Sequence, residues 1–234
     1  MVKPNGRDEL PRRAAVSTMT NDRGDAAVNT VREIDHPLVA HHLTRLRDKS
    51  TPPSEFRRLV RRLAYLLAYD ATQDLALTDR PVETPLSTML GKELQGRLGL
   101  VPILRAGLGM IDPVLELLPD AEVWHLGLYR DEATLEPVEY YQKLPSGRPV
   151  DVGFVLDPML ATGGSIAAAV TALKHWGAPT IRILSILAAP EGVRMLGERF
   201  PDVRIHVCAV DERLNEVGYI VPGLGDAGDR CFNT

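Results

Sequence analysis

An acid, two hydroxyl residues and two glycines lie close together in the stretch VLDPMLATGGS. Asp157 ends an apolar run, and a helix-like pattern begins near Ser165. Gly163 and Gly164 allow backbone N–H groups to turn toward an anion, while the hydroxyls of Thr162 and Ser165 and the positive end of the helix add to the attraction. These residues predict a phosphate-binding turn, although two glycines before a helix also fit an ordinary strand-to-helix turn. The stretch is neither a P-loop, since no Lys follows the glycines, nor the dinucleotide motif G-x-G-x-x-G.

Two arginines directly follow other apolar runs. Arg105 comes after LVPIL, and Arg130 comes after VWHLGLY. The carboxyl ends of parallel strands meet at one edge of a sheet, and ligands collect there. We therefore expect both arginines to lie near Asp157, where their charges would attract an anionic ligand.

Short apolar runs alternate with helical patterns along most of the chain, as in VGFVL followed by SIAAAVTALKHW. Near-continuous apolar strands are typical of a parallel sheet that is covered on both faces. We therefore predict an α/β fold with a mostly parallel central sheet and helices on both faces. The stretch SEFRRLVRRLAYLLAYDAT predicts an amphipathic helix with Ser54 as its N-cap. Its arginines either form the solvated face of that helix or contact RNA.

The composition limits the class of protein. A chain of 234 residues with 44% hydrophobic content can bury one substantial core, so we expect a single domain over residues 29–234. Residues 1–28 have few bulky apolar side chains and predict a flexible extension. The formal net charge of −4 provides no basic field for nucleic acid, and no apolar run is long enough to span a membrane. With only two cysteines and no apolar signal segment, we expect a cytoplasmic protein.

Several motifs in order resemble the uracil phosphoribosyltransferases, a branch of the type I phosphoribosyltransferase family. The stretch VLDPMLATGGS is similar to the family's phosphoribosyl-pyrophosphate (PRPP) loop, and the single acid at its start is characteristic of the uracil enzymes. The resemblance continues through DHPLVAHHLTRLRD, VPILRAGLGM, LEPVEYYQKLP, LAAPEG and LNEVGYIVPGLGDAGDR. It covers the chain from about Val31 to the C-terminus. It implies the type I phosphoribosyltransferase fold, with a β-hairpin arm and a C-terminal base-binding segment.

The resemblance also implies a function. The expected reaction transfers the 5-phosphoribosyl group of PRPP to N1 of uracil and gives uridine monophosphate (UMP) and diphosphate. The residues expected to carry catalysis are Arg105, Arg130, Asp157 and Asp226. Asp226 is also a candidate general base. The expected PRPP-binding residues are Arg105, Arg130, Asp157, Pro158, Met159, Leu160, Ala161, Thr162, Gly163, Gly164, Ser165 and Asp226, and the expected uracil-binding residues are Ile220, Gly225, Asp226 and Ala227.

The residue types agree with these roles. The turn from Thr162 to Ser165 suits the 5′-phosphate, and an ionised Asp157 suits the two ribose hydroxyls because a carboxylate accepts two hydrogen bonds side by side. Arg105 and Arg130 can neutralise the leaving diphosphate. The expected cofactor is Mg²⁺, carried mainly by the diphosphate oxygens and water rather than by protein ligands. The alternative role of Asp226 is that of a carboxylate that caps a loop.

The segment from Asp131 to Pro149 predicts a polar hairpin with Tyr140 and Tyr141 in its returning strand. This hairpin would act as a lid over the reactants or as an arm in a subunit contact. The resemblance implies a homo-oligomer, a dimer or larger, and it leaves GTP open as an activator, since GTP activates some relatives. Two other functions on the same fold stay open, a uracil-responsive RNA-binding regulator and a non-catalytic PRPP sensor.

Overall fold

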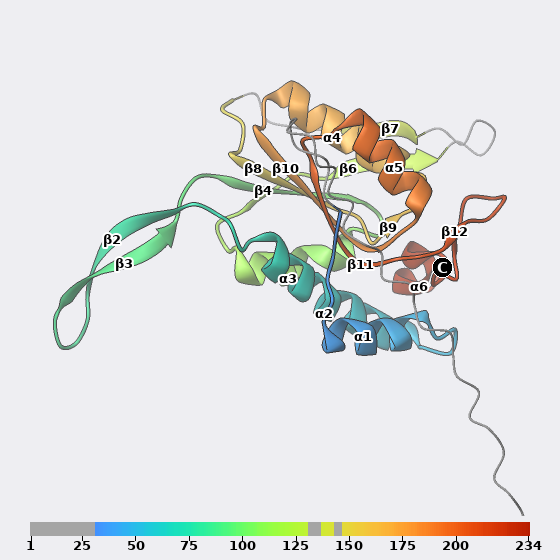
Figure 1. Cartoon of the computed structure of the whole chain (residues 1–234), viewed down its shortest axis with the longest axis horizontal. Coiled ribbons are helices and arrows are strands. Elements are labelled where there is room, and N and C mark those ends of the chain that lie inside the picture. Colours follow the sequence, from blue (N-terminus) through green and yellow to red (C-terminus); the bar gives the residue numbers. More distant parts are fainter. Residues whose placement is uncertain (1–30, 131–136, 143–146) are drawn as a thin grey trace, which may run out of the picture.

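The computed structural model describes residues 31–130, 137–142 and 147–234, and for residues 126, 128–130 and 137–142 it describes the backbone alone. Within these ranges, the main sheet follows the strand order β1-β11-β10-β8-β4-β6-β7, with β5 paired to β4 and β9 paired to β10 (Figure 1). The strands are β1 (Val31–Glu33), β4 (Leu98–Leu104), β5 (Glu122–Val123), β6 (Leu126–Arg130), β7 (Pro137–Gln142), β8 (Val152–Leu156), β9 (Met159–Leu160), β10 (Thr180–Ala188) and β11 (Arg204–Val210).

Parallel pairing dominates this sheet, as the apolar runs predict. β8, β10 and β4 pair in parallel with their neighbours, and the β6–β7 pair is antiparallel. Strands β4, β8 and β10 are buried along nearly their whole length, because helices cover both of their faces. The predicted α/β class with a mostly parallel sheet is therefore confirmed.

Helices lie on both faces of the sheet (Figure 1). Buried side chains of α1, α2, α3 and α6 pack into one core on one face, and those of α4 and α5 pack into a second core on the other face. The helices are α1 (Pro37–Arg47), α2 (Pro53–Ala71), α3 (Leu108–Leu117), α4 (Gly164–Trp176), α5 (Pro190–Arg199) and α6 (Ala227–Phe232). In the part of the chain that the structure describes, no helix is long and apolar enough to cross a membrane.

Helix α2 has the predicted apolar face, since Phe56, Leu59 and Leu63 have no exposed surface. The predicted N-cap at Ser54 is wrong, because the helix begins at Pro53, where the fixed backbone angle of proline suits the first helical position. Its arginines lie mainly on the outer face. Arg61 pairs with Asp112 at 2.9 Å, as one of several contacts that these arginines make within the chain.

The structure contains two long hairpins, one at the edge of the main sheet and one outside it. Of the hairpin predicted over residues 131–149, the returning strand with Tyr140 and Tyr141 is present as β7, which pairs with β6; residues 131–136 and 143–146 lie outside the described residues. The other hairpin was not predicted. It consists of β2 (Leu77–Glu83) and β3 (Thr88–Leu94) and stands away from the body of the molecule (Figure 1). Nearly all of its residues are exposed, including Leu86 at its turn. Among the residues that the structure describes, its apolar side chains therefore stay largely exposed.

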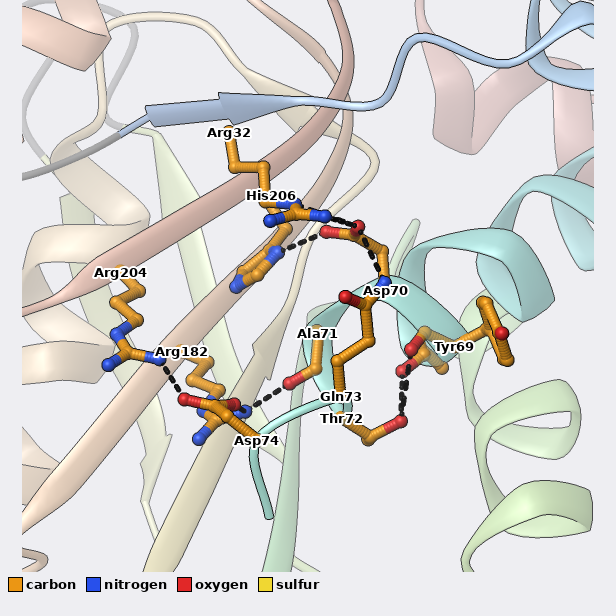
Figure 2. Close-up of polar contacts among 11 residues, drawn as sticks. Arg32, Tyr69, Asp70, Ala71, Thr72, Gln73, Asp74, Arg182, Arg204 and His206 are labelled. Carbon is orange, nitrogen blue, oxygen red and sulfur yellow. Dashed lines mark hydrogen bonds and ion pairs between the residues drawn. The ribbon is translucent and has the colours of Figure 1, made fainter.

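A partly buried polar cluster joins the end of α2 to the sheet (Figure 2). The Asp70 carboxylate lies 2.7 Å from a guanidinium nitrogen of Arg32 on β1 and 2.8 Å from Nδ1 of His206 on β11. Asp74, just beyond the helix, accepts a hydrogen bond of 2.7 Å from Arg182 on β10. Burial lowers the pKa of His206, so the neutral ring donates its Nδ1–H to Asp70. The cluster fixes α2 at the amino-terminal half of β10 and β11.

Candidate active site

Asp157 directly follows β8, as predicted. Its backbone N–H donates to the carbonyl of Leu184 at 3.2 Å, and its Oδ1 accepts a hydrogen bond of 3.1 Å from the N–H of Met159. Burial and, to a smaller extent, the nearby charge of Asp226 raise the pKa of the Asp157 carboxyl from 3.8 to about 7, while the hydrogen bond from Met159 opposes the rise. The free carboxyl is therefore poised between its neutral and ionised forms near neutral pH.

The segment between Asp157 and α4 is a well-bonded turn. The Pro158 carbonyl accepts hydrogen bonds of 3.0 Å from the N–H groups of Ile186 and Leu187, and Met159 and Leu160 form β9 beside β10. These contacts hold the segment to the carboxyl end of β10. Because residues 158–160 are bonded to β10, the residues that follow, Ala161 to Ser165, lie at the carboxyl-terminal edge of the sheet.

The glycine turn has the conformation that the phosphate prediction needs. Gly163 has a φ of +85°, and a Cβ at this position would lie 2.5 Å from Cε of Met195. Helix α4 begins at Gly164, and the first bond of its ladder runs from the N–H of Ala167 to the carbonyl of Gly163 at 2.8 Å. The N–H groups before Ala167 therefore have no partner in the helix and are oriented along its positive end. Thr162 is exposed and Ser165 is half-buried beside them.

Arg105 follows β4, the strand beside β8. The turn after it lies against the end of β8, since a Cβ on Gly107 would lie 2.5 Å from the carbonyl oxygen of Leu156. The Arg105 guanidinium is 57% exposed and lies 3.1 Å from Oδ1 of Asp229. Arg130 is the last residue of β6, which pairs in parallel with β4, and its side chain lies outside the described part. The structure thus places the backbones of both arginines at the strand ends that the sequence predicted.

The C-terminal segment combines a short strand with two glycines in left-handed conformations. Ile220 belongs to the short strand β13 (Ile220–Val221), which pairs with β12 (Arg213–Leu214). Gly223 has a φ of +58° and Gly225 a φ of +83°, which are left-handed conformations that favour glycine. The side chain of Ile220 and that of Ala227 are buried, whereas Gly225 is exposed.

Asp226 is the N-cap of α6, and its Oδ1 accepts a hydrogen bond of 2.9 Å from the N–H of Asp229. The capping role that the sequence analysis set against ligand binding is therefore present in this structure. The predicted contact with PRPP and uracil stays a prediction. The Arg105 guanidinium lies beside this turn, since its Nη2 is 3.9 Å from the position of a Cβ on Gly228.

The structure therefore brings Arg105, Asp157, the Gly163 turn and Asp226 to one edge of the sheet. A cation, a helix start with unpaired N–H groups and a carboxylate can bind a phosphorylated molecule that also carries hydroxyl groups. Within residues 31–130, 137–142 and 147–234, no group of three His, Cys, Asp or Glu side chains could hold a metal ion.

Two further residues support this edge and were not predicted from the sequence. Asp211 follows β11 just as Asp157 follows β8, and it binds Arg47 at the end of α1. An acid directly after an apolar strand was the signal that could have identified Asp211. Arg47 had no such signal, because it lies 164 residues from its partner along the chain.

Comparison with known proteins identifies the family. The family model described as uracil phosphoribosyltransferase matches residues 33–234. A curated uracil phosphoribosyltransferase of Roseiflexus sp. (strain RS-1) is 62% identical over 199 residues, which cover 85% of this chain and 96% of that protein. One of Bacillus thuringiensis (strain Al Hakam) is 56% identical over 201 residues, or 86% of this chain and 96% of that protein.

Solved structures agree with the sequence comparison. The structure of the AQ2163 protein from Aquifex aeolicus superposes with a TM-score of 0.83 and 38% identity, covering 87% of this chain and 98% of that one. The resemblance found in the sequence motifs is therefore confirmed over nearly all of the described chain. The protein belongs to the uracil phosphoribosyltransferase family.

Proposed function

We propose that this enzyme transfers the 5-phosphoribosyl group of PRPP to N1 of uracil and releases UMP and diphosphate. The observation that carries the proposal is the turn between β8 and α4. Gly163, in a left-handed conformation, precedes the first residue of α4, and the carboxyl of Asp157 lies at the start of the same turn. A phosphate and a pair of sugar hydroxyls are the groups that such a turn and carboxylate bind best. Family membership indicates uracil as the substrate base and phosphoribosyl transfer as the reaction.

The proposed roles follow from position. The N–H groups and hydroxyls of Thr162 to Ser165 bind the 5′-phosphate. Pro158, Met159 and Leu160 hold this turn to β10, and Ala161 bonds back to Met159; all four line the PRPP site in this proposal. The ionised Asp157 accepts hydrogen bonds from the 2′- and 3′-hydroxyls. Arg105 and Arg130 stabilise the negative charge that develops on the departing diphosphate. These side chains therefore hold the two ends of PRPP on opposite sides of the sugar.

The base site is proposed for Ile220, Gly225, Asp226 and Ala227. Glycine-rich backbone can approach a flat ring closely and offer both N–H and C=O groups to it. Asp226 also contacts PRPP in this proposal, because its carboxylate lies close enough to Asp157 to raise its pKa. Asp226 is the candidate to accept the N1 proton.

Mg²⁺ is the proposed cofactor. The charged groups at this edge include the Asp157 carboxyl, whose pKa is raised, and the exposed guanidinium of Arg105. These groups suit a diphosphate that arrives with its cation already bound, since Mg²⁺ in phosphate sites is held largely by phosphate oxygens and water. When bound, the ion would neutralise part of the diphosphate charge. After chelator treatment, the rate at fixed PRPP should rise with the concentration of added Mg²⁺. A rate that does not depend on added Mg²⁺ would contradict this proposal.

The exposed hairpin of β2 and β3 supports the proposal that the enzyme is a homo-oligomer. Leu77, Leu94, Pro81 and Leu90 occupy paired positions on one face of it, and Leu90 is 66% exposed. A two-stranded hairpin with no covering layer is marginally stable in water, and a second copy of the chain would bury this face. We expect Leu90→Lys to reduce the mass measured by light scattering, whereas Thr78→Lys on the opposite face should not.

Three further parts of the proposal concern organisation. Residues 29–234 form one domain after a 28-residue extension, so removal of residues 1–28 should leave turnover unchanged. The buried free thiols of Cys208 and Cys231 suit a reducing compartment, and we place the enzyme in the cytoplasm. GTP is proposed as an activator because of the family resemblance, and a GTP titration of the initial rate tests it.

The deciding experiment measures UMP formation from uracil, PRPP and Mg²⁺, with cytosine and hypoxanthine as parallel substrates and with GTP present and absent. Turnover of uracil far faster than that of cytosine or hypoxanthine is the expected result. Absence of turnover with every base would contradict the proposal and return attention to a PRPP sensor or an RNA-binding regulator, neither of which the comparisons support.

A further inference from the structure

An ion pair at the end of α1 holds the proposed base-binding segment. Nη1 of Arg47 lies 2.7 Å from Oδ2 of Asp211, and Nη2 lies 2.5 Å from Oδ1. The Asp211 side chain is 4% exposed and that of Arg47 is 23% exposed. Two parallel charge-assisted hydrogen bonds fix the orientation of both groups as well as their separation.

This pair binds both polar backbone groups of Gly223. The Gly223 carbonyl accepts a hydrogen bond of 2.9 Å from Nη1 of Arg47, and the Gly223 N–H donates to Oδ2 of Asp211 at 2.9 Å. Gly223 is in a left-handed conformation, and glycine can adopt many others at little cost. The ion pair therefore selects one orientation of the peptide groups at Gly223.

Other contacts connect the ion pair and the segment to the rest of the fold. The N–H of Asp211 donates to the carbonyl of Ala188 at the end of β10, at 2.8 Å. Arg230 donates to the carbonyl of Leu224 at 2.9 Å and to that of Leu46, next to Arg47, at 2.8 Å. The residues before Gly225 are thus bonded to α1 and to the edge of the sheet at which residues 158–165 form the proposed PRPP-binding turn.

The orientation of peptide groups matters because the proposed site recognises the base through backbone. Uracil presents a ring N–H between two carbonyl acceptors, whereas cytosine presents an amino donor and an unprotonated ring nitrogen. When a peptide group flips, a C=O acceptor replaces an N–H donor at the site. The flipped peptide then matches the hydrogen-bonding pattern of cytosine better than that of uracil. Unpaired buried groups at such a site can discriminate strongly between related substrates.

We propose that Arg47 and Asp211 are positioning residues that set the selectivity for uracil by fixing the peptide groups of residues 220–227. This inference rests on the base site proposed above. Neither side chain touches the base. Each acts through Gly223, and loss of the pair frees a glycine-rich segment to sample peptide orientations that do not match uracil.

The test compares Arg47→Lys and Asp211→Asn with the parent enzyme in steady-state assays with uracil and with cytosine. Lysine keeps the charge of Arg47 but lacks the fork that makes two parallel bonds. We expect the KM for uracil to rise by about tenfold or more and the ratio of kcat/KM for uracil over cytosine to fall by a similar factor. The KM for PRPP should change by no more than about twofold, since the turn at residues 158–165 has its own anchors on β10 and Asp226 is held as the N-cap of α6.

Asp70→Asn is the matched control, because its carboxylate is 7% exposed and also pairs with an arginine, at the amino-terminal half of β11. It should lose stability and keep the parent's base selectivity. Thermal unfolding of each variant shows which ones fold, and Arg47→Lys, the milder change, decides the matter if Asp211→Asn does not fold. Equal effects on the KM values of uracil and PRPP, or a selectivity as high as that of Asp70→Asn, would overturn the positioning role. A parent enzyme that does not turn over uracil would instead refute the proposed function.

Discussion

The raised pKa of Asp157 leads to a measurable pH dependence of stability. In the folded chain the carboxyl keeps its proton up to a pH of about 7, whereas the unfolded chain releases it near the ordinary value of 3.8. The folded state therefore binds more protons between these two values, and the free energy of unfolding falls as the pH rises from about 4 to about 7. The whole difference corresponds to about 4 kcal/mol, at about 1.4 kcal/mol for each pKa unit.

The perturbation that tests this is Asp157→Asn. Asparagine has nearly the same shape, and its Oδ1 can still accept the hydrogen bond from Met159, so the main change is the loss of the titrating group. We expect the variant to become more stable relative to the parent as the pH rises, with the difference in free energy of unfolding widening by about 2 to 3 kcal/mol between pH 5 and pH 8.

Urea unfolding of both proteins, without ligand, at pH 5 and pH 8 measures this difference. The m-values of the two proteins should agree, which shows that the same surface is exposed on unfolding. A stability difference that is the same at both pH values would refute the reasoning, because it would mean that the Asp157 carboxyl titrates in its ordinary range while folded.

The same titration should appear in PRPP binding. The ionised fraction of a group with a pKa of about 7 rises roughly tenfold between pH 6 and pH 8, and only the ionised form can accept two hydroxyl hydrogen bonds. We expect the ratio of PRPP affinities, parent over variant, to rise by about tenfold over this range. Taking the ratio removes the titration of PRPP itself, which both proteins experience. A flat ratio would show that Asp157 does not bind the sugar as a carboxylate.

Three other substitutions test separate parts of the structure. Gly163→Ala adds a Cβ at a φ of +85° and 2.5 Å from Met195, so the KM for PRPP should rise by about tenfold or more in initial-rate assays, while the KM for uracil changes little. Arg105→Gln removes a charge proposed to act on the departing diphosphate, and kcat should fall by about 10²- to 10³-fold, whereas an unchanged kcat would contradict that role. Asp70→Ala leaves buried His206 without its acceptor and should lower the free energy of unfolding by about 1 to 3 kcal/mol in urea, with unchanged turnover at 25 °C as the check that the site is separate.

The sequence could predict the central sheet because its strands are fully buried. A strand with helices on both faces, such as β10, must be apolar at nearly every position, and this leaves a run that needs no periodicity to be found. The residues after such runs, Asp157 and Arg105, stand out for the same reason, since a charge cannot continue inside that layer. Position after a buried strand was therefore enough to place both residues at one edge.

The hairpin of β2 and β3 was missed because its environment within one chain gives no pattern. Leu90 and Leu94 are exposed on it, and charged residues share the same face, so neither an apolar run nor a strict alternation marks the strands. The pair of Arg47 and Asp211 was missed for a different reason. It forms only when the end of α1 meets the end of β11, and no local spacing records that contact.

The single acid at the end of β8 fits the electrostatics of this edge. Leu156 precedes Asp157 and has no exposed surface, so a second acid there would place a charge in the core, at a cost that no neighbouring cation offsets in the described contacts. The nearby second carboxylate comes instead from Asp226 on the opposite segment, and its charge helps to keep Asp157 partly protonated while the site is free of substrate. PRPP that arrives with its cation would favour the ionised form and release that proton. Binding near pH 7 should therefore be coupled to proton release, and calorimetry in buffers of different ionisation enthalpy should detect a release that Asp157→Asn abolishes.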